Sequence, residues 1–244
     1  MFDYLPIASG AAVAAAGLAS VYHATYSVRS QWLGPTCWRG PADSRCVALT
    51  FDDGPSDDTA GVLDALAKYK VKVAFFVVGQ QVEKFPELAR RIVDEGHEIG
   101  NHSYSHPIYL YRTPSETRRQ LELTQRIIRD VTGVEARFAR PPCGVRTPAY
   151  FSAARELGLR TIQWSVAGFD WKRRSGEQIA ESVLNGAEPG SIILLHDGDS
   201  ENKMGRAATV AALPMIIEGL RAKDLAAAPI EKMFMETEGA PVAA

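Results

Sequence analysis

The sequence predicts an α/β fold built around a parallel sheet. Short β-rich runs alternate along the chain with segments of helical periodicity, and polar clusters stand directly after successive runs. Strands and helices that take turns in this way imply helical crossovers between parallel strands, in a sheet that is either open or closed into a barrel. The chain has 244 residues, of which 46% are hydrophobic, so it is long enough for a substantial core.

The expected strands are apolar runs that end at turn-forming or polar residues. The first, 46–51, is followed by the turn sequence Asp52-Asp53-Gly54-Pro55. The run 97–100 delivers Asn101 and His102 at its end. The remaining strands are expected at 71–78, 136–139, 161–166 and 191–195.

The expected helices show apolar side chains on one face, at spacings of three and four residues. The first of them, 61–69, places Val62, Leu63 and Leu66 on one side. A second helix carries Phe85, Leu88, Ile92 and Val93. Further helices are expected at 116–131, 150–157, 177–184 and 207–222.

The N-terminal segment differs from the rest, and we divide the chain into a hydrophobic segment, 1–30, and a catalytic domain, 31–244. Residues 4–28 carry no formal charge, and 5–26 is long enough to cross a bilayer as a helix. We therefore expect membrane association through residues 5–26. An Ala-rich helix packed on the domain and a signal peptide are the alternatives, and the side of the membrane stays open.

Charge and cysteine spacing exclude several classes of function. The formal net charge is −2, and no Lys/Arg stripe with interleaved aromatic residues is present, so no nucleic acid is expected as a partner. Cys37, Cys46 and Cys143 form no C-x-x-C pair, which argues against a zinc knuckle or a thioredoxin-type redox site.

The polar clusters locate the candidate site, because the carboxyl ends of parallel strands line the active site in α/β folds. Each cluster follows one expected strand and carries groups capable of catalysis or metal binding. They are Asp52-Asp53, His102 with His106, Arg140, Asp170 and His196-Asp197.

Two histidines and the paired aspartates suggest a metal site. His102 and His106 are four residues apart, so a helical or tightly turned segment places both imidazoles on one face. Two imidazoles and one carboxylate form a common catalytic zinc arrangement. One of Asp52 and Asp53 can then bind the metal while the other accepts a proton from water. The alternative is a solvated Asp-Asp-Gly-Pro turn.

The other clusters fit acid–base chemistry around such a metal. His196 follows an apolar strand and is either a core histidine or a general acid. Asp170 could orient and charge it, because a neighbouring carboxylate favours imidazolium. Arg140 could hold the base aspartate through a charge-assisted hydrogen bond. His97 lies inside a short strand and is expected to be structural.

Five motifs in order then resemble those of the polysaccharide deacetylases, the NodB homology domain family or carbohydrate esterase family 4. They are Thr50-Phe-Asp-Asp-Gly-Pro55, His102-Ser-Tyr-Ser-His106, Arg140-Pro-Pro-Cys-Gly144, Asp170-Trp171 and Leu195-His196, within residues 45–225. The resemblance implies a distorted (β/α) barrel and a divalent metal, usually Zn²⁺.

The resemblance also implies a role for each motif residue. Asp53, His102 and His106 would bind the metal, and Asp52 would be the base, supported by Arg140. Asp170 would tune His196, which would protonate the leaving amine. Cys143, Trp171 and Leu195 would line the substrate and oxyanion side, with a backbone N–H near Cys143 facing the oxyanion.

The implied activity is metal-dependent hydrolysis of an N-acyl group, with N-acetyl expected, on an amino sugar of a glycan. Two positions depart from the family pattern: Ala167 stands where a further aspartate is frequent, and Cys143 where an aromatic residue is usual. The alternatives are a deformylase or deacylase of a lipid-linked amino sugar, and an inactive sugar-binding homologue.

Overall fold

The computed structural model describes residues 5–200 and 204–235, and it confirms the α/β architecture. All strand pairings in the sheet are parallel, in the order β5-β4-β3-β2-β1-β7-β6, with β8 added beside β1. The strands are β1 (Cys46–Asp52), β2 (Ala74–Val77), β3 (Glu98–Asn101), β4 (Phe138–Ala139), β5 (Arg160–Thr161), β6 (Val166–Ala167), β7 (Ile192–His196) and β8 (Ala226–Ala227).

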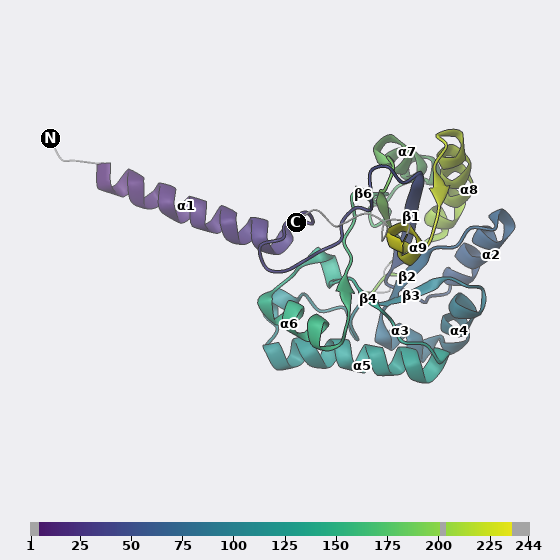
Figure 1. Cartoon of the computed structure of the whole chain (residues 1–244), viewed down its shortest axis with the longest axis horizontal. Coiled ribbons are helices and arrows are strands. Elements are labelled where there is room, and N and C mark those ends of the chain that lie inside the picture. The colour runs from purple at the N-terminus through teal and green to yellow at the C-terminus, as the bar shows by residue number, and fades with distance from the viewer. Residues whose placement is uncertain (1–4, 201–203, 236–244) are drawn as a thin grey trace.

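The sheet curls into the expected distorted barrel, and helices surround it (Figure 1). The pairing path begins at β5 and ends at β6, so consecutive strands of the chain form its two edges. The helices are α1 (Leu5–Tyr26), α2 (Thr59–Tyr69), α3 (Gly79–Lys84), α4 (Pro86–Asp94), α5 (Pro114–Thr132), α6 (Pro148–Glu156), α7 (Gly176–Gly186), α8 (Ala207–Ala222) and α9 (Ile230–Met235). Two 3₁₀ turns, η1 (Tyr109–Tyr111) and η2 (Pro142–Gly144), lie in loops.

Successive residues of the central strands point to opposite faces of the sheet, so their side chains pack into two different hydrophobic clusters. Leu49 and Phe51 of β1 belong to the larger cluster, which packs the outer face of the sheet against the helices. Ala48 faces the barrel interior, where it belongs to the smaller hydrophobic cluster together with Ile230 and Met233 of α9. The intervening Thr50 donates a hydrogen bond to the Ile193 carbonyl. Both faces of the sheet are therefore covered, and only the strand ends are left for a site.

The structure corrects three details of the predicted elements. The single strand expected at 161–166 is two short strands, β5 and β6, because the chain leaves one edge of the sheet and returns at the other. The helix expected around Phe85 is two helices, α3 and α4, and Pro86 begins the second, where its missing N–H costs nothing. The strand β8 and the helix α9 had no counterpart in the prediction.

Helix α1 projects from the body of the molecule (Figure 1). Its residues 12–23 are exposed, so it is not packed on the domain over that length. The end of α1 and the residue Ser27 after it contact the domain: the fully buried Arg146 donates to the carbonyls of Thr25 and Ser27 at 3.3 and 2.5 Å, and His23 packs against Trp32. Within the described residues, no helix is both long and apolar enough to cross a membrane.

Candidate active site

Backbone strain is concentrated at the carboxyl ends of the strands. Among the described residues, seven non-glycine residues have positive φ, and five of these lie in loops at this end of the sheet: Asp53, Ser103, His106, Cys143 and Phe169. Left-handed backbone is costly for residues with a side chain and is retained mainly at functional sites. This concentration places the site where the polar clusters predicted it.

The predicted metal ligands come together in this region. The ligand atoms of Asp53, His102 and His106 all lie within 4.8 Å of one another. Asp53 Oδ1 is 3.2 Å from His106 Nε2 and 3.5 Å from His102 Nε2. Asp53 follows β1, and His102 follows β3, so strands from different parts of the chain deliver the three groups.

The tautomer of His102 is determined by its neighbour. His102 Nδ1 lies 2.7 Å from the Arg140 carbonyl oxygen. A carbonyl oxygen can only accept, so Nδ1 carries the proton and donates it. In the neutral ring Nε2 is therefore unprotonated and presents its lone pair towards Asp53. This is the usual way in which a second hydrogen bond prepares a histidine to bind a metal.

The pKa values of two of these groups favour their ligand forms. Burial alone raises the pKa of Asp53, but the adjacent His102 and His106 rings lower it well below its usual range, so the carboxylate is ionised. Burial lowers the pKa of His106, although the Asp53 charge opposes the shift, so the ring is more readily neutral. An ionised carboxylate and neutral imidazoles are the protonation states that metal binding requires.

The donor set fits a divalent cation. Asp53 Oδ1 is buried and has no hydrogen-bond partner among the described residues, although the His102 and His106 Nε2 atoms lie close to it. A buried carboxylate oxygen without a donor is unfavourable unless a cation satisfies it. One carboxylate and two imidazoles form a three-ligand set of the kind found in catalytic zinc sites.

Asp52 is held differently from Asp53. Its Oδ1 accepts a hydrogen bond of 2.7 Å from Arg140 Nη1, and its Oδ2 lies 3.7 Å from His102 Nε2. Arg140 is fully buried, and its remaining N–H groups reach Thr50 Oγ1 and the carbonyls of Ile162 and Gln163. Arg140 thus neutralises one oxygen of Asp52 and leaves the other facing the metal ligands.

His196 and Asp170 form a second pair, in which the carboxylate is buried and the imidazole is partly exposed. Asp170 Oδ1 is 2.8 Å from His196 Nδ1, and Asp170 Oδ2 accepts the His196 backbone N–H at 2.7 Å. Because a carboxylate accepts, Nδ1 donates, and Nε2 is left for the site. Burial lowers the pKa of His196, but the Asp170 carboxylate outweighs burial and raises the pKa above its ordinary value.

Comparison with known proteins agrees with this geometry. The polysaccharide deacetylase family model matches residues 39–162. A peptidoglycan-N-acetylglucosamine deacetylase of Bacillus cereus is 38% identical over 200 residues, which cover 82% of this chain and 72% of that protein.

This chain belongs to the polysaccharide deacetylase family. As a member, it is a metal-dependent hydrolase that removes an N-acyl group from an amino sugar.

Two solved structures extend the similarity to the fold. The crystal structure of the Bc1960 peptidoglycan N-acetylglucosamine deacetylase has a TM-score of 0.78 and 37% identity, and the match covers 82% of this deacetylase and 92% of that chain. BA3943 of Bacillus anthracis, described as a CE4 family pseudoenzyme, has a TM-score of 0.75 and 30% identity, with 82% and 68% covered. Because the fold is shared with a pseudoenzyme, the completeness of the site in each chain matters.

The remaining predicted site residues of this deacetylase lie at different depths. Trp171 is 40% exposed, and its ring packs edge-on against His196 at 5.4 Å. Cys143 is exposed in η2 with a φ of 54°. Leu195, in contrast, is fully buried in the outer core, where a Cβ on Gly168 would touch it. The structure therefore brings Trp171 to His196, places Cys143 in the loop that follows β4, and does not bring the Leu195 side chain to the surface of the site.

Several supporting residues were missed by the sequence reasoning. Asp197 is fully buried, accepts a 2.5 Å hydrogen bond from Thr59 Oγ1, and lies so close to Gly54 that a Cβ there would overlap its carboxylate. Burial raises the pKa of Asp197 to about 7. Arg206 donates to the Gly198 and Asp170 carbonyls at 2.6 and 3.0 Å. The sequence had grouped Asp197 with His196 as a polar cluster after a strand, but it had assigned Asp197 no role.

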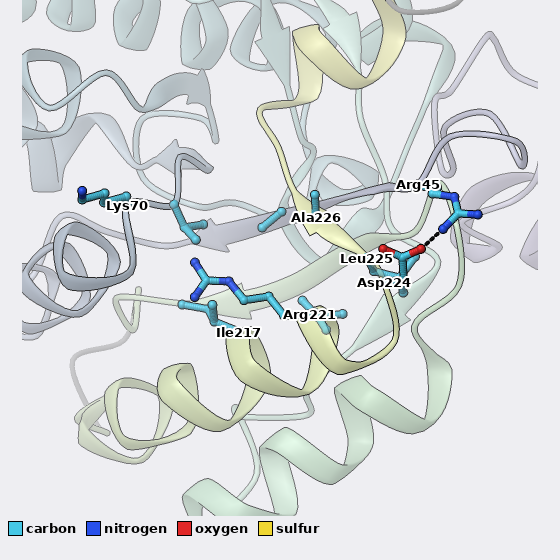
Figure 2. Close-up of a pocket in the computed structure, with 10 residues that line it drawn as sticks. Arg45, Lys70, Ile217, Arg221, Asp224, Leu225 and Ala226 are labelled. Carbon is cyan, nitrogen blue, oxygen red and sulfur yellow. Dashed lines mark ion pairs between the residues drawn. The ribbon is translucent and has the colours of Figure 1, made fainter.

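Two features of this deacetylase lie away from the site. His97 is buried before β3, and its Nδ1 accepts the Val73 N–H at 3.2 Å, which confirms a structural position. A cavity of about 330 Å³ lies elsewhere in the molecule, and Arg45, Ala226 and Arg221 are among its lining residues (Figure 2). It lies near the start of β1, at the opposite end of that strand from Asp52. Neither feature contributes to the metal cluster.

Proposed function

We propose that this deacetylase hydrolyses the acetamido groups of amino sugars in peptidoglycan-type glycan strands, with zinc as its metal. The observation that carries the proposal is the juxtaposition of a complete three-ligand cluster with Asp52, which Arg140 holds, and with the His196–Asp170 pair. The names of the similar proteins, which are peptidoglycan deacetylases, support the choice of glycan.

The ligand side chains in this proposal are Asp53, His102 and His106. A divalent ion bound there supplies a Lewis acid that polarises a carbonyl group and makes water more acidic. Two nitrogens and one oxygen suit zinc better than the oxygen-rich sets that magnesium and calcium prefer.

Asp52 acts as the general base. Its Oδ2 faces the ligand cluster and can accept the proton of the attacking water, while Oδ1 stays in its hydrogen bond with Arg140. The bonds that Arg140 makes to Thr50, Ile162 and Gln163 keep the carboxylate from rotating. Such a positioned base contributes roughly 10²–10⁴ to the rate.

His196 acts as the general acid, and the loop of Cys143 stabilises the oxyanion. Asp170 holds the His196 ring through Nδ1, so the protonated Nε2 can donate to the amine as the carbon–nitrogen bond breaks. The N–H of Cys143 is proposed to donate to the developing oxyanion. Trp171 packs on His196 and limits its access to water.

Residues 5–26 are proposed to associate the enzyme with a membrane. Support comes from the lack of any formal charge in residues 4–28, and from the exposure of Val13, Leu18 and Tyr22 on the projecting helix α1. Apolar side chains that no protein surface covers favour a lipid environment.

The test is a comparison of three substrates with the zinc-loaded protein: peptidoglycan glycan strands, neutral N-acetylglucosamine oligomers and lipid-linked amino sugars. Release of acetate and appearance of a free amine on the strands is expected. Faster release of formate or acetate from the lipid-linked sugar would favour the alternative deformylase or deacylase. Glycan binding without release from any substrate would identify an inactive homologue and overturn the proposal.

A further inference from the structure

The loop between β6 and α7, residues 168–175, carries two exposed aromatic rings at the edge of the site. Trp171 packs on His196 with 5.4 Å between ring centroids, and Phe169 lies 5.3 Å from Trp171. The exposed fractions of Phe169 and Trp171 are 37% and 40%. A contiguous aromatic surface therefore leads from the proposed acid out to solvent.

The backbone holds Phe169 in this outward position. Its φ of 56° is unusual for a bulky residue, and the Lys172 N–H donates to its carbonyl at 3.0 Å. The next residue, Asp170, is buried and bonded to both His196 and Thr209. Because these bonds hold Asp170 in the interior, the neighbouring Phe169 side chain is directed towards the solvent. An observed outlier of this kind points to a function.

Two cations converge on the Phe169 ring. Lys172 Nζ and the Arg174 guanidinium carbon each lie 5.2 Å from its centroid, within the range of cation–π contacts. Arg174 also donates to Ser182 Oγ at 2.6 Å, a neutral partner. These contacts fix the positions of side chains that are otherwise flexible.

No carboxylate neutralises this group within the described part of the chain. Neither Lys172, Arg173 nor Arg174 takes part in a salt bridge there, whereas many other arginines do, such as Arg39, Arg91 and Arg118. The acids that flank the loop have other partners: Asp170 is bonded to His196, and Glu177 is hydrogen-bonded to Ser175 at the start of α7. Like charges brought together without a counter-ion repel one another, and they attract an anion from solution.

We propose that Lys172 and Arg174, held on Phe169, form a subsite for a carboxylate carried by the glycan beside the sugar that is deacetylated. The inference rests on the proposed function and narrows its substrate to acidic glycan strands. The aromatic rings provide apolar surface for a sugar, and the two cations select a strand with an acidic substituent. The carboxylate can belong to the sugar itself or to a peptide attached to it.

The experiment compares kcat/KM for matched strands. One carries free carboxylates on alternate sugars, a second carries primary amides at the same positions, and a third carries peptides with free carboxylates. Each exposed ion pair is worth a factor of about 1.4 to 5, so we expect the wild-type enzyme to prefer a carboxylate strand over the amide by about three- to tenfold. The strand with the larger preference identifies the source of the carboxylate. The preference should appear mainly in KM and weaken at high salt.

Variants then locate the preference. In the double variant Lys172→Gln/Arg174→Gln, the ratio of kcat/KM for the carboxylate strand to kcat/KM for the amide strand should fall close to one. Phe169→Leu should also lower this ratio, although it leaves both cationic side chains in place. Arg173→Gln is the matched control, because it removes one charge from the same loop while leaving both cations on the Phe169 ring, and it should retain most of the preference for the carboxylate strand.

The subsite proposal would be overturned if the wild type and the double variant showed the same carboxylate-to-amide ratio of kcat/KM. It would also be overturned if Arg173→Gln alone abolished the preference for the carboxylate strand. Failure to deacetylate any strand would instead contradict the proposed function. The two failures are therefore distinguishable.

Discussion

Asp52 and His196 are direct partners in the register of β1 with β7. Residues paired in this way on adjacent strands point to the same face of the sheet and are separated by about one strand spacing, 4.7–4.9 Å. The proposed base and the proposed acid therefore stand beside each other at the end of the barrel. Arg140 holds one of them and Asp170 the other. This pairing underlies the predictions on catalysis.

Asp52→Asn should retain the metal and lose activity. An amide cannot accept the proton of water, so kcat should fall by roughly 10²–10⁴. The metal ligands are unchanged, so zinc content measured by elemental analysis should stay at one per chain. Turnover within tenfold of the wild type, in protein that is folded and zinc-loaded, would exclude Asp52 as the base.

His102→Ala should lose metal and activity together, because it removes one of three protein ligands. His97→Ala is the matched control: it also removes a buried histidine, but one whose Nδ1 contacts the Val73 N–H away from the cluster. The control should lower the melting temperature and keep its zinc. Full zinc occupancy in His102→Ala would contradict the ligand assignment.

Asp170→Asn should change the pH dependence of kcat/KM. The Asp170 carboxylate raises the pKa of His196 against the effect of burial, so removing its charge lowers that pKa. A general acid must be protonated, and activity is lost as pH rises through its pKa. The basic limb should therefore move to lower pH.

Thr209→Val is the control for Asp170→Asn. It removes a 2.9 Å hydrogen bond to Asp170 but keeps the carboxylate charge, so the limb should move much less. A basic limb that stays in place in Asp170→Asn would show that Asp170 does not tune the acid.

Substitutions at Cys143 should separate its side chain from its backbone. Cys143→Ser and Cys143→Ala keep the N–H and should retain activity within about tenfold, or roughly 1.4 kcal/mol of barrier. Cys143→Gly suits the φ of 54° and should be tolerated as well. Cys143→Pro removes the N–H and requires a negative φ, so a loss of roughly 10²–10³ or more is expected. Loss of turnover in both Ser and Ala variants, with normal zinc, would require a thiolate in the mechanism.

Truncation should separate membrane association from folding. The full chain is expected to sediment with membranes and to resist salt extraction, whereas a chain that starts at His23 should be soluble and active. A chain that starts at Gly40 also loses the carbonyls of Thr25 and Ser27, which leaves the buried Arg146 guanidinium without these acceptors. Its melting temperature should be lower by about 5–10 °C, from several kcal/mol of lost hydrogen bonding. A freely soluble full-length chain would argue against the membrane proposal.

Local patterns were sufficient where a segment contains its own signal. Strand β1 was predicted because an apolar run ends at Asp52-Asp53-Gly54, and α8 because its apolar period continues for the whole of Ala207–Ala222. The prediction of a single strand at 161–166 was wrong, because β5 and β6 lie at opposite edges of the sheet. Which edge a short strand joins depends on its partners, and a run of six residues does not contain them.

The α/β class, the end of the sheet that holds the site and the residue types gathered there follow from the sequence alone, because the alternation of strands with helices and the polar residues at strand ends are visible in local patterns. The sequence also determined the family, through five motifs in order. Only the tertiary structure decided which side chains face the site. Leu195 lies beside His196 in the chain yet points into the core, since successive strand residues alternate between faces. Arg146 and Asp197 acquired their roles from α1 and from Gly54, far away in the chain. Such contacts join residues that are far apart in the chain, and they form only when the whole domain folds, so no local sequence pattern predicts them.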